Sequence, residues 1–310
     1  TRYYIDAGAG GLAVGVHATQ FAIREVGLYE PVLELAAQTV REWTDRPLVM
    51  IAGLSGRTPQ AVREAQLARK YGYHAGLLSL ATMKGASIDE LIAHCAAVAD
   101  QISLIGFYLQ TAVGGIPLTM EFWRRFALIE NVVAVKMAPF DRYRTQDVVR
   151  GVVAARAEER VTLYTGNDDH IVLDLLAPFA VKRDGQDVTV RIRGGLLGHW
   201  SVWTRSAVQQ LERIHAAIAA DSVDAALLAL DSRATDCNSA FFDVANDFSG
   251  CIPGCHEVLR RQGLLERIDC LDPNERLSPG QAEAIDRVCR EHADLSDDDF
   301  VAANLHRWLG

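Results

Sequence analysis

Seven short apolar runs recur along the chain, separated by segments with helical periodicity. They cover residues 11–16, 48–52, 75–80, 102–108, 132–136, 161–165 and 194–198. Each run has the length of a buried strand, and neighbouring runs begin about 25 to 37 residues apart. Strands that alternate with helices in this way pair in parallel through right-handed crossovers. The pattern therefore predicts an α/β protein built as a TIM barrel.

A closed barrel has eight strands, and the pattern gives seven. The segment from Thr1 to Asp6 resembles a helix with no strand before it, so we expect the first barrel strand to be missing from this chain. An Asp-Gly pair at 184–185, inside alternating residues 181–188, predicts a β-hairpin inserted before the last strand. We expect residues 1–200 to form the barrel and residues 201–310 to form helices that pack on it.

Hydroxyl side chains indicate where several helices begin. Thr58 stands before a proline, which suits the first turn of a helix. Ser87 and Glu90 have the spacing of a capping box, in which each side chain binds the other residue's backbone amide. Thr119 and Thr145 are predicted to cap the next two helices.

Composition narrows the class of protein. The 310 residues are 49% hydrophobic and 23% charged, which is ordinary for a globular protein with a large core. The net charge of -9 disfavours a nucleic-acid partner, because phosphates attract basic surfaces. No apolar stretch approaches the roughly 20 residues of a membrane span, so we expect no membrane partner. No secretory leader is recognisable, and we expect a cytoplasmic protein.

The six cysteines are scattered, which predicts reduced thiols rather than a disulfide framework. Cys251, Cys255 and His256 lie close together in the sequence and are possible metal ligands. A second cluster at zinc-ligand spacing is not found, so we expect no metal.

Lys136 is the residue with the clearest chemical meaning. It ends the apolar run 131–135 and is followed at once by Met-Ala-Pro. A lysine at the end of a buried strand has its ammonium where water is scarce, which favours the neutral amine. A neutral amine can attack a carbonyl carbon and form a Schiff base. The alternative is a lysine that snorkels to the rim of the barrel or pairs with a carboxylate.

Active sites of α/β barrels lie at the carboxyl ends of the strands. The polar residues that follow the predicted strands there are His17, Tyr108 and the pair Asp168 and Asp169. Each has a structural alternative, such as a hydrogen-bonded core tyrosine or a helix cap. A tyrosine and a lysine on adjacent strand ends together suggest that the phenol moves protons during imine formation.

These residues make the chain resemble the dihydrodipicolinate synthase and N-acetylneuraminate lyase family of class I aldolases. The strand ending at Lys136 resembles the strand of the family's Schiff-base lysine, and the segment at Tyr108 resembles its catalytic tyrosine strand. The Gly-Asn-Asp at 166–168 resembles its glycine–aspartate turn, and residues 6–12, 245–248 and 258–264 resemble further segments. The resemblance implies a barrel with C-terminal helices that assembles as a homodimer or homotetramer.

Three loops depart from the family pattern. The carboxylate-binding Gly-Thr-Thr-Gly-Glu loop is replaced by Val-His-Ala-Thr-Gln-Phe at 16–21, which has no glycine. The Tyr-Tyr-Asn-x-Pro stretch is replaced by Ala-Thr-Met-Lys-Gly at 81–85. The Asn-x-Pro and arginine after the catalytic tyrosine are replaced by residues 109–115. Authentic dihydrodipicolinate synthase activity is therefore not expected.

The resemblance implies a Schiff-base lyase, either an aldolase or a hydro-lyase, that acts on a small carbonyl substrate such as a 2-keto acid without a cofactor. Lys136 would form the imine and Tyr108 would act as general acid and base. Residues proposed to bind the substrate are His17, Ala18, Thr19, Gly166, Asn167 and Asp168. The alternative is a non-catalytic homologue that binds a small carboxylate or a sugar acid.

Overall fold

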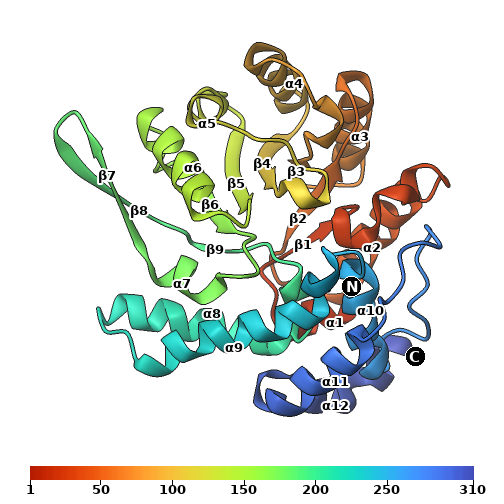
Figure 1. The fold of residues 1–310 in the computed structure, drawn as a ribbon. Coiled ribbons are helices and arrows are strands. Elements are labelled where there is room, and N and C mark those ends of the chain that lie inside the picture. Colours follow the sequence, from red (N-terminus) through yellow and green to blue (C-terminus); the bar gives the residue numbers. More distant parts are fainter.

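A computed structural model describes residues 1–310. Its main sheet has seven parallel strands, which curl round in the order β1-β2-β3-β4-β5-β6-β9 (Figure 1). These strands are β1 (Gly11–Val14), β2 (Val49–Leu54), β3 (Ala75–Leu78), β4 (Ser103–Leu109), β5 (Val132–Ala138), β6 (Thr162–Thr165) and β9 (Gly194–Gly195). The fold is TIM-barrel-like, as predicted. The sheet is open, because β1 pairs only with β2, and β9 pairs only with β6.

Helices surround the strands in the order expected for repeated strand–helix units (Figure 1). Those within the barrel are α1 (Arg2–Ala7), α2 (Tyr29–Trp43), α3 (Thr58–Lys70), α4 (Ile88–Ala99), α5 (Met120–Ala127), α6 (Arg142–Ala154) and α7 (Ile171–Leu176). The predicted hairpin is β7 (Pro178–Arg183) and β8 (Gln186–Arg191), an antiparallel pair that projects from the body. None of the helices is both long enough and apolar enough to cross a bilayer.

The helix starts follow the sequence signals at two of four positions. Ser87 and Glu90 form the predicted capping box of α4, and Thr119 accepts a hydrogen bond from the amide of Phe122. The other two predictions are corrected. Arg57 is the N-cap residue of α3, which leaves Thr58 inside the helix. Asp141 caps α6 with its carboxylate, so Thr145 lies one turn inside it.

The C-terminal helices are α8 (Thr204–Ala219), α9 (Ala225–Phe241), α10 (Cys251–Arg261), α11 (Gln281–Glu291) and α12 (Asp298–Leu309). Buried polar contacts join them to the barrel. The hydroxyl of Tyr3 on α1 donates to the Oδ2 atom of Asp297 at 2.7 Å and accepts from the amide of Thr204 at 2.8 Å. Asp231 on α9 accepts hydrogen bonds from the amides of Val172 and Leu173, each at 3.0 Å. The first turn of α7 is thus capped by a side chain from a distant helix.

We predict that Asp231→Ala lowers the free energy of unfolding by about 1–2 kcal/mol, because two amides of α7 lose their acceptor inside the protein. Urea denaturation followed by circular dichroism measures this change. Glu283→Ala, which removes an exposed acid from α11, is the matched control. Equal stability of the two variants would show that Asp231 does not hold α7.

Candidate active site

A cavity of about 1000 Å³ occupies the interior of the open barrel. The inward side chains of the strands form most of its wall. Residues 8–10, which precede β1, Val208 and Leu211 on α8, and Cys251 and Cys255 on α10 also contribute to the lining, and 31 of the 52 lining residues are hydrophobic. The cavity is therefore an apolar chamber, in which any charged group loses much of its hydration.

Lys136 faces this chamber from β5, near the carboxyl end of the strand. Its Nζ atom lies 4.6 Å from the centroid of the Phe107 ring, which comes from the neighbouring strand β4. Burial lowers the pKa of Lys136 to about 8, although the negative charge of Asp168 acts in the opposite direction. About a tenth of the amine is therefore neutral, and nucleophilic, at pH 7, far more than for an ordinary lysine with a pKa near 10.4.

Asp168 lies in the same cavity, three residues beyond the end of β6. Its Oδ1 atom accepts the amide hydrogen of His199 at 2.9 Å, and its backbone carbonyl accepts a hydrogen bond from Asn238 at 2.6 Å. Burial raises the pKa of Asp168 to about 7, against the opposing effects of the His199 amide and of Lys136. The pair thus combines an amine that readily gives up its proton with a carboxyl group that readily keeps one.

Gly166 places the loop after β6 directly against Lys136. A Cβ atom at this position would lie 2.8 Å from the Cε atom of Lys136 and 2.9 Å from the Cβ atom of Ala138. Only glycine leaves the lysine side chain its space, so the predicted position of Gly166 beside the site is supported by the geometry.

Asn167 does not line the cavity, although the sequence predicted that it would. Its side chain is buried on the opposite side of the loop, where Nδ2 donates to Thr145 at 3.2 Å and to Asp174 at 2.9 Å. Its Oδ1 atom accepts the amide hydrogen of Phe140 at 3.0 Å. Asn167 is therefore a positioning residue that joins the loop after β5 to the loop after β6.

The predicted carboxylate-binding residues form a single turn after β1. His17, Ala18 and Thr19 make one turn of 3-10 helix, and all three line the cavity. The two backbone hydrogen bonds of this turn are donated by the amides of Thr19 and Gln20. The amides of His17 and Ala18 take no part in them. Burial lowers the pKa of His17 to about 4, with a further contribution from the charge of Lys136, so its imidazole is neutral near pH 7.

A buried ion pair supports this turn from behind. The guanidinium group of Arg24 pairs with Glu64 at 2.9 Å and donates to the carbonyl oxygen of Gly53 at 2.9 Å and to that of Gly15 at 3.3 Å. The backbones of Gly15 and Gly53 come so close that a Cβ atom on Gly53 would lie 2.3 Å from the Gly15 carbonyl oxygen. The ends of β1 and β2 are thus fixed together beneath the turn.

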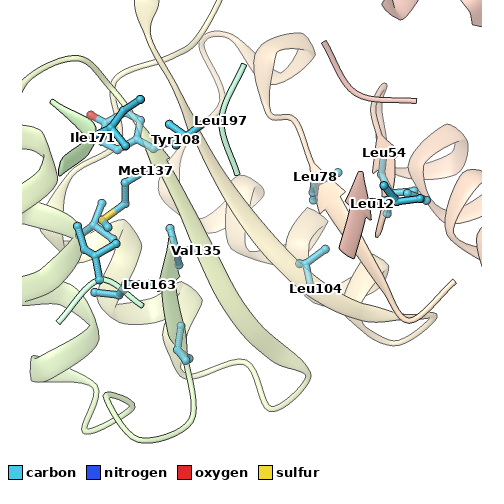
Figure 2. Packing of buried hydrophobic residues seen from close by; sticks show 14 of the residues in the cluster. Leu12, Leu54, Leu78, Leu104, Tyr108, Val135, Met137, Leu163, Ile171 and Leu197 are labelled. Atoms are coloured by element: carbon cyan, nitrogen blue, oxygen red, sulfur yellow. The ribbon is translucent and has the colours of Figure 1, made fainter. Parts of the chain in front are cut away.

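The structure corrects the predicted position of Tyr108. Side chains alternate along a strand, and Phe107 is the residue in register with Lys136, so Tyr108 points to the other face of the sheet. There it packs against Trp123 in the buried cluster between the strands and helices shown in Figure 2. Its hydroxyl group donates to the carbonyl of Leu118 and accepts from the amide of the same residue, both at 3.1 Å. The proton relay predicted for Tyr108 lacks the contact with Lys136 that it requires.

Several cavity residues were not among the predicted site residues. Tyr164 on β6 is in register with Lys136 and presents the only tyrosine side chain from a strand to the cavity. Cys251, at the start of α10, also lines it. Side chains alternate along a strand, so Thr162 and Tyr164 lie on the same face of β6. This alternation could have indicated Tyr164 as a cavity residue. No local pattern in the sequence indicates that residues after position 240 reach the barrel mouth.

Comparison with known proteins gives one consistent result. The model of the dihydrodipicolinate synthetase family matches residues 1–178. No curated protein matches the chain. A solved structure of a putative dihydrodipicolinate synthetase from Pseudomonas aeruginosa has a TM-score of 0.73 at 17% identity and covers 92% of this chain and 88% of its own.

Two further similar structures contain pyruvate. One is the chloride-inhibited dihydrodipicolinate synthase from Acinetobacter baumannii, with a TM-score of 0.73, 17% identity and coverage of 93% of this chain and 88% of its own. The other is YagE, a prophage protein of the dihydrodipicolinic acid synthase family from E. coli K12, with a TM-score of 0.73, 18% identity and coverage of 93% and 89%. At this level of identity the structures support the fold alone.

We predict that Tyr108→Phe lowers the free energy of unfolding by about 1–3 kcal/mol, because the buried amide of Leu118 loses its acceptor. Reaction of Lys136 with a carbonyl compound should not change, because the hydroxyl group lies outside the cavity. Chemical denaturation measures the first effect, and mass spectrometry of the borohydride-reduced adduct measures the second. Loss of the adduct in a folded Tyr108→Phe protein would restore the catalytic assignment.

Proposed function

Because the chain belongs to the dihydrodipicolinate synthetase family, we propose that it is a lyase that forms a Schiff base between Lys136 and a 2-keto acid. One observation carries this proposal: a lysine with a pKa of about 8 at the carboxyl end of a barrel strand, facing an apolar cavity. The reaction is either an aldol cleavage or condensation, or the loss of water, since both pass through the same imine and enamine.

In the first step the neutral amine of Lys136 attacks the keto carbon and gives a carbinolamine. Asp168 then donates its proton to the carbinolamine hydroxyl group, which leaves as water while the nitrogen lone pair forms the iminium bond. The iminium withdraws electrons from the adjacent carbon, where a C–C bond or a C–H bond breaks and gives the enamine. The Asp168 carboxylate formed in the preceding step accepts the released proton, which comes from the substrate hydroxyl group in C–C cleavage and from the carbon in C–H cleavage. In this mechanism Asp168 takes the acid–base role that the sequence assigned to Tyr108.

The turn at residues 17–19 is proposed to hold the substrate carboxylate. The amides of His17 and Ala18, the Thr19 hydroxyl group and the neutral imidazole of His17 supply hydrogen-bond donors on the cavity wall. Gly166 leaves room for the keto carbon beside Lys136. Authentic dihydrodipicolinate synthase activity is not proposed, because Val113 lines the cavity in the segment where the family has its arginine.

One observation favours the alternative of a binding protein without catalysis. The residue in register with Lys136 on β4 is Phe107, which has no proton to exchange. The proposed assembly as a homodimer or homotetramer rests on the resemblance, and one similar solved structure is described as a monomeric dihydrodipicolinate synthase variant. The six free thiols are consistent with the proposed cytoplasmic location.

The test of the function is borohydride trapping with pyruvate, read as a mass increase of the intact protein. We predict an adduct in the wild-type protein and none in Lys136→Ala, because no other lysine faces the cavity. Lys84→Ala, which changes a lysine after β3 outside the cavity, is the control. An adduct that persists in Lys136→Ala would exclude the proposed nucleophile, and keto-acid binding without an adduct would favour the binding protein.

We predict a bell-shaped pH dependence for the rate of imine formation. The neutral amine of Lys136 accumulates as the pH rises through about 8, whereas the acid form of Asp168 is lost as the pH rises through about 7. The rate should therefore be highest between pH 7 and 8 and fall on both sides. Imine formed at successive times can be quenched with borohydride and quantified by mass from pH 6 to 9.

In Asp168→Asn the fall at high pH should disappear, because the residue no longer titrates. The rate should instead rise to a plateau with the titration of Lys136 alone, whose pKa falls because the carboxylate that stabilises its ammonium has been removed. The rate should fall by about 10²- to 10⁴-fold, the usual contribution of a general acid. A profile identical to that of the wild type would exclude Asp168 as the proton donor.

A further inference from the structure

Two phenylalanines with unusual backbone conformations meet at the edge of the cavity. Phe140 follows β5 four residues after Lys136, and Phe248 lies in the loop before α10. Both line the cavity and both are half-buried. Their rings pack edge to face, with centroids 5.9 Å apart and planes inclined by 75°. The pair joins a barrel loop to a C-terminal loop more than a hundred residues away in the sequence.

Both residues have backbone angles that bulky side chains rarely adopt. The φ angle is 53° at Phe140 and 66° at Phe248, in the left-handed region that favours glycine. Such strain persists only where the surrounding structure enforces it, and it concentrates at functional sites. A packing role alone does not require an aromatic ring at a strained position, which makes the pair a candidate for ligand contact.

Buried polar groups hold the two backbones in place. The amide of Phe140 donates to the Oδ1 atom of Asn167 at 3.0 Å. The amide of Phe248 donates to the carbonyl of Asp243 at 3.0 Å, and the Asp243 carboxylate accepts the amide hydrogen of Gly250 at 2.9 Å. Asp243 and Asn167 are both almost fully buried. Buried polar groups therefore fix the backbones that carry both rings.

The surroundings of the pair are apolar and lack a fixed positive charge. Phe140 packs against the inner cluster that contains Phe107 and Ala138. Other apolar lining residues are Leu196, Phe242 and Ile252. The one arginine in the cavity wall, Arg193, immediately precedes β9 and is exposed to solvent. An anionic tail would lose its hydration among these apolar side chains, which offer no charge to replace it.

We propose that Phe140 and Phe248 determine substrate specificity by binding the tail of the keto acid, and that this tail is an uncharged aryl group. The inference rests on the proposed function, since the tail is defined as the part of the substrate beyond the carbonyl bound to Lys136. Aromatic side chains prefer edge-to-face or offset contact with another ring, and the existing pair offers both a face and an edge. The substrate class is therefore an aryl-substituted 2-keto acid.

The test compares three keto acids by borohydride trapping: pyruvate, which has no tail; 2-oxoglutarate, which has an anionic tail; and 4-phenyl-2-oxobutanoate. The concentration that gives half-maximal adduct is measured for each by intact mass. We expect the aryl compound to need roughly tenfold less than either other acid, the size of effect that a buried ring contact gives. Equal or weaker trapping of the aryl compound would overturn the specificity inference.

The variants Phe140→Leu and Phe248→Leu remove the rings and keep apolar side chains. In each, the preference for the aryl compound over pyruvate should fall by several-fold to about tenfold. Tyr143→Ala, which removes an aromatic residue that is 84% exposed on α6, should keep the wild-type preference. Circular dichroism establishes that each variant is folded. An unchanged preference in the folded leucine variants would overturn the assignment.

The two proposals fail in distinguishable ways. Pyruvate trapped at Lys136 without a preference for the aryl compound would contradict only the role of the phenylalanine pair. No adduct with any of the three acids would contradict the Schiff-base function and, with it, the inference that depends on it.

Discussion

The chemistry proposed for this protein depends on the cost of keeping an ammonium group in an apolar chamber. The side chain of Lys136 extends from a parallel strand into a cavity whose walls are mostly hydrocarbon, and Asp168 only partly compensates its charge. The same burial shifts the pKa values of the two groups in opposite directions, because it disfavours the charged form of each. The pKa of the amine falls and that of the carboxyl group rises. In the proposed mechanism, desolvation thus prepares both the nucleophile and the acid.

The architecture keeps this pair in place through contacts that lie outside the cavity. Asn167 faces away from the site, yet it joins the loop that carries Phe140 to the loop that carries Asp168. Arg24 and Glu64 fix the strand ends beneath the turn at residues 17–19. The C-terminal helices supply Cys251 and, through Asn238, support Asp168. The reactive groups are therefore positioned by buried polar side chains, each of which has its own hydrogen-bond partners.

Much of the fold could be predicted from the sequence, because each strand and helix has a local signal. The seven strands, the Asp-Gly hairpin and the capping box at Ser87 follow from periodicity and turn chemistry. It was harder to predict which side chains of each strand face the cavity, because a shift of one residue exchanges the two faces. Tyr108 was assigned to the cavity for this reason, whereas the register with β5 gives that position to Phe107. Lys136 could be recognised because a lysine at the end of an apolar run is informative by itself.

The remaining site residues depend on contacts between distant segments. Nothing near Phe248 in the sequence indicates that it meets Phe140, and the left-handed backbone of both residues follows from hydrogen bonds with Asn167 and Asp243. Asp168 was expected to bind substrate. Its proposed role as an acid became visible only when its burial and its proximity to Lys136 were known. Local patterns thus indicate the proposed nucleophile, and tertiary structure shows which groups surround it.

The central claim is that Lys136 is desolvated enough to be partly neutral near physiological pH. It is tested most directly by reductive methylation with ¹³C-formaldehyde, followed by an NMR titration of the labelled amine that is missing in Lys136→Ala. We predict a transition near pH 8, well separated from the surface lysines, which titrate near 10.4. A Lys136 signal that titrates together with the surface lysines would contradict it.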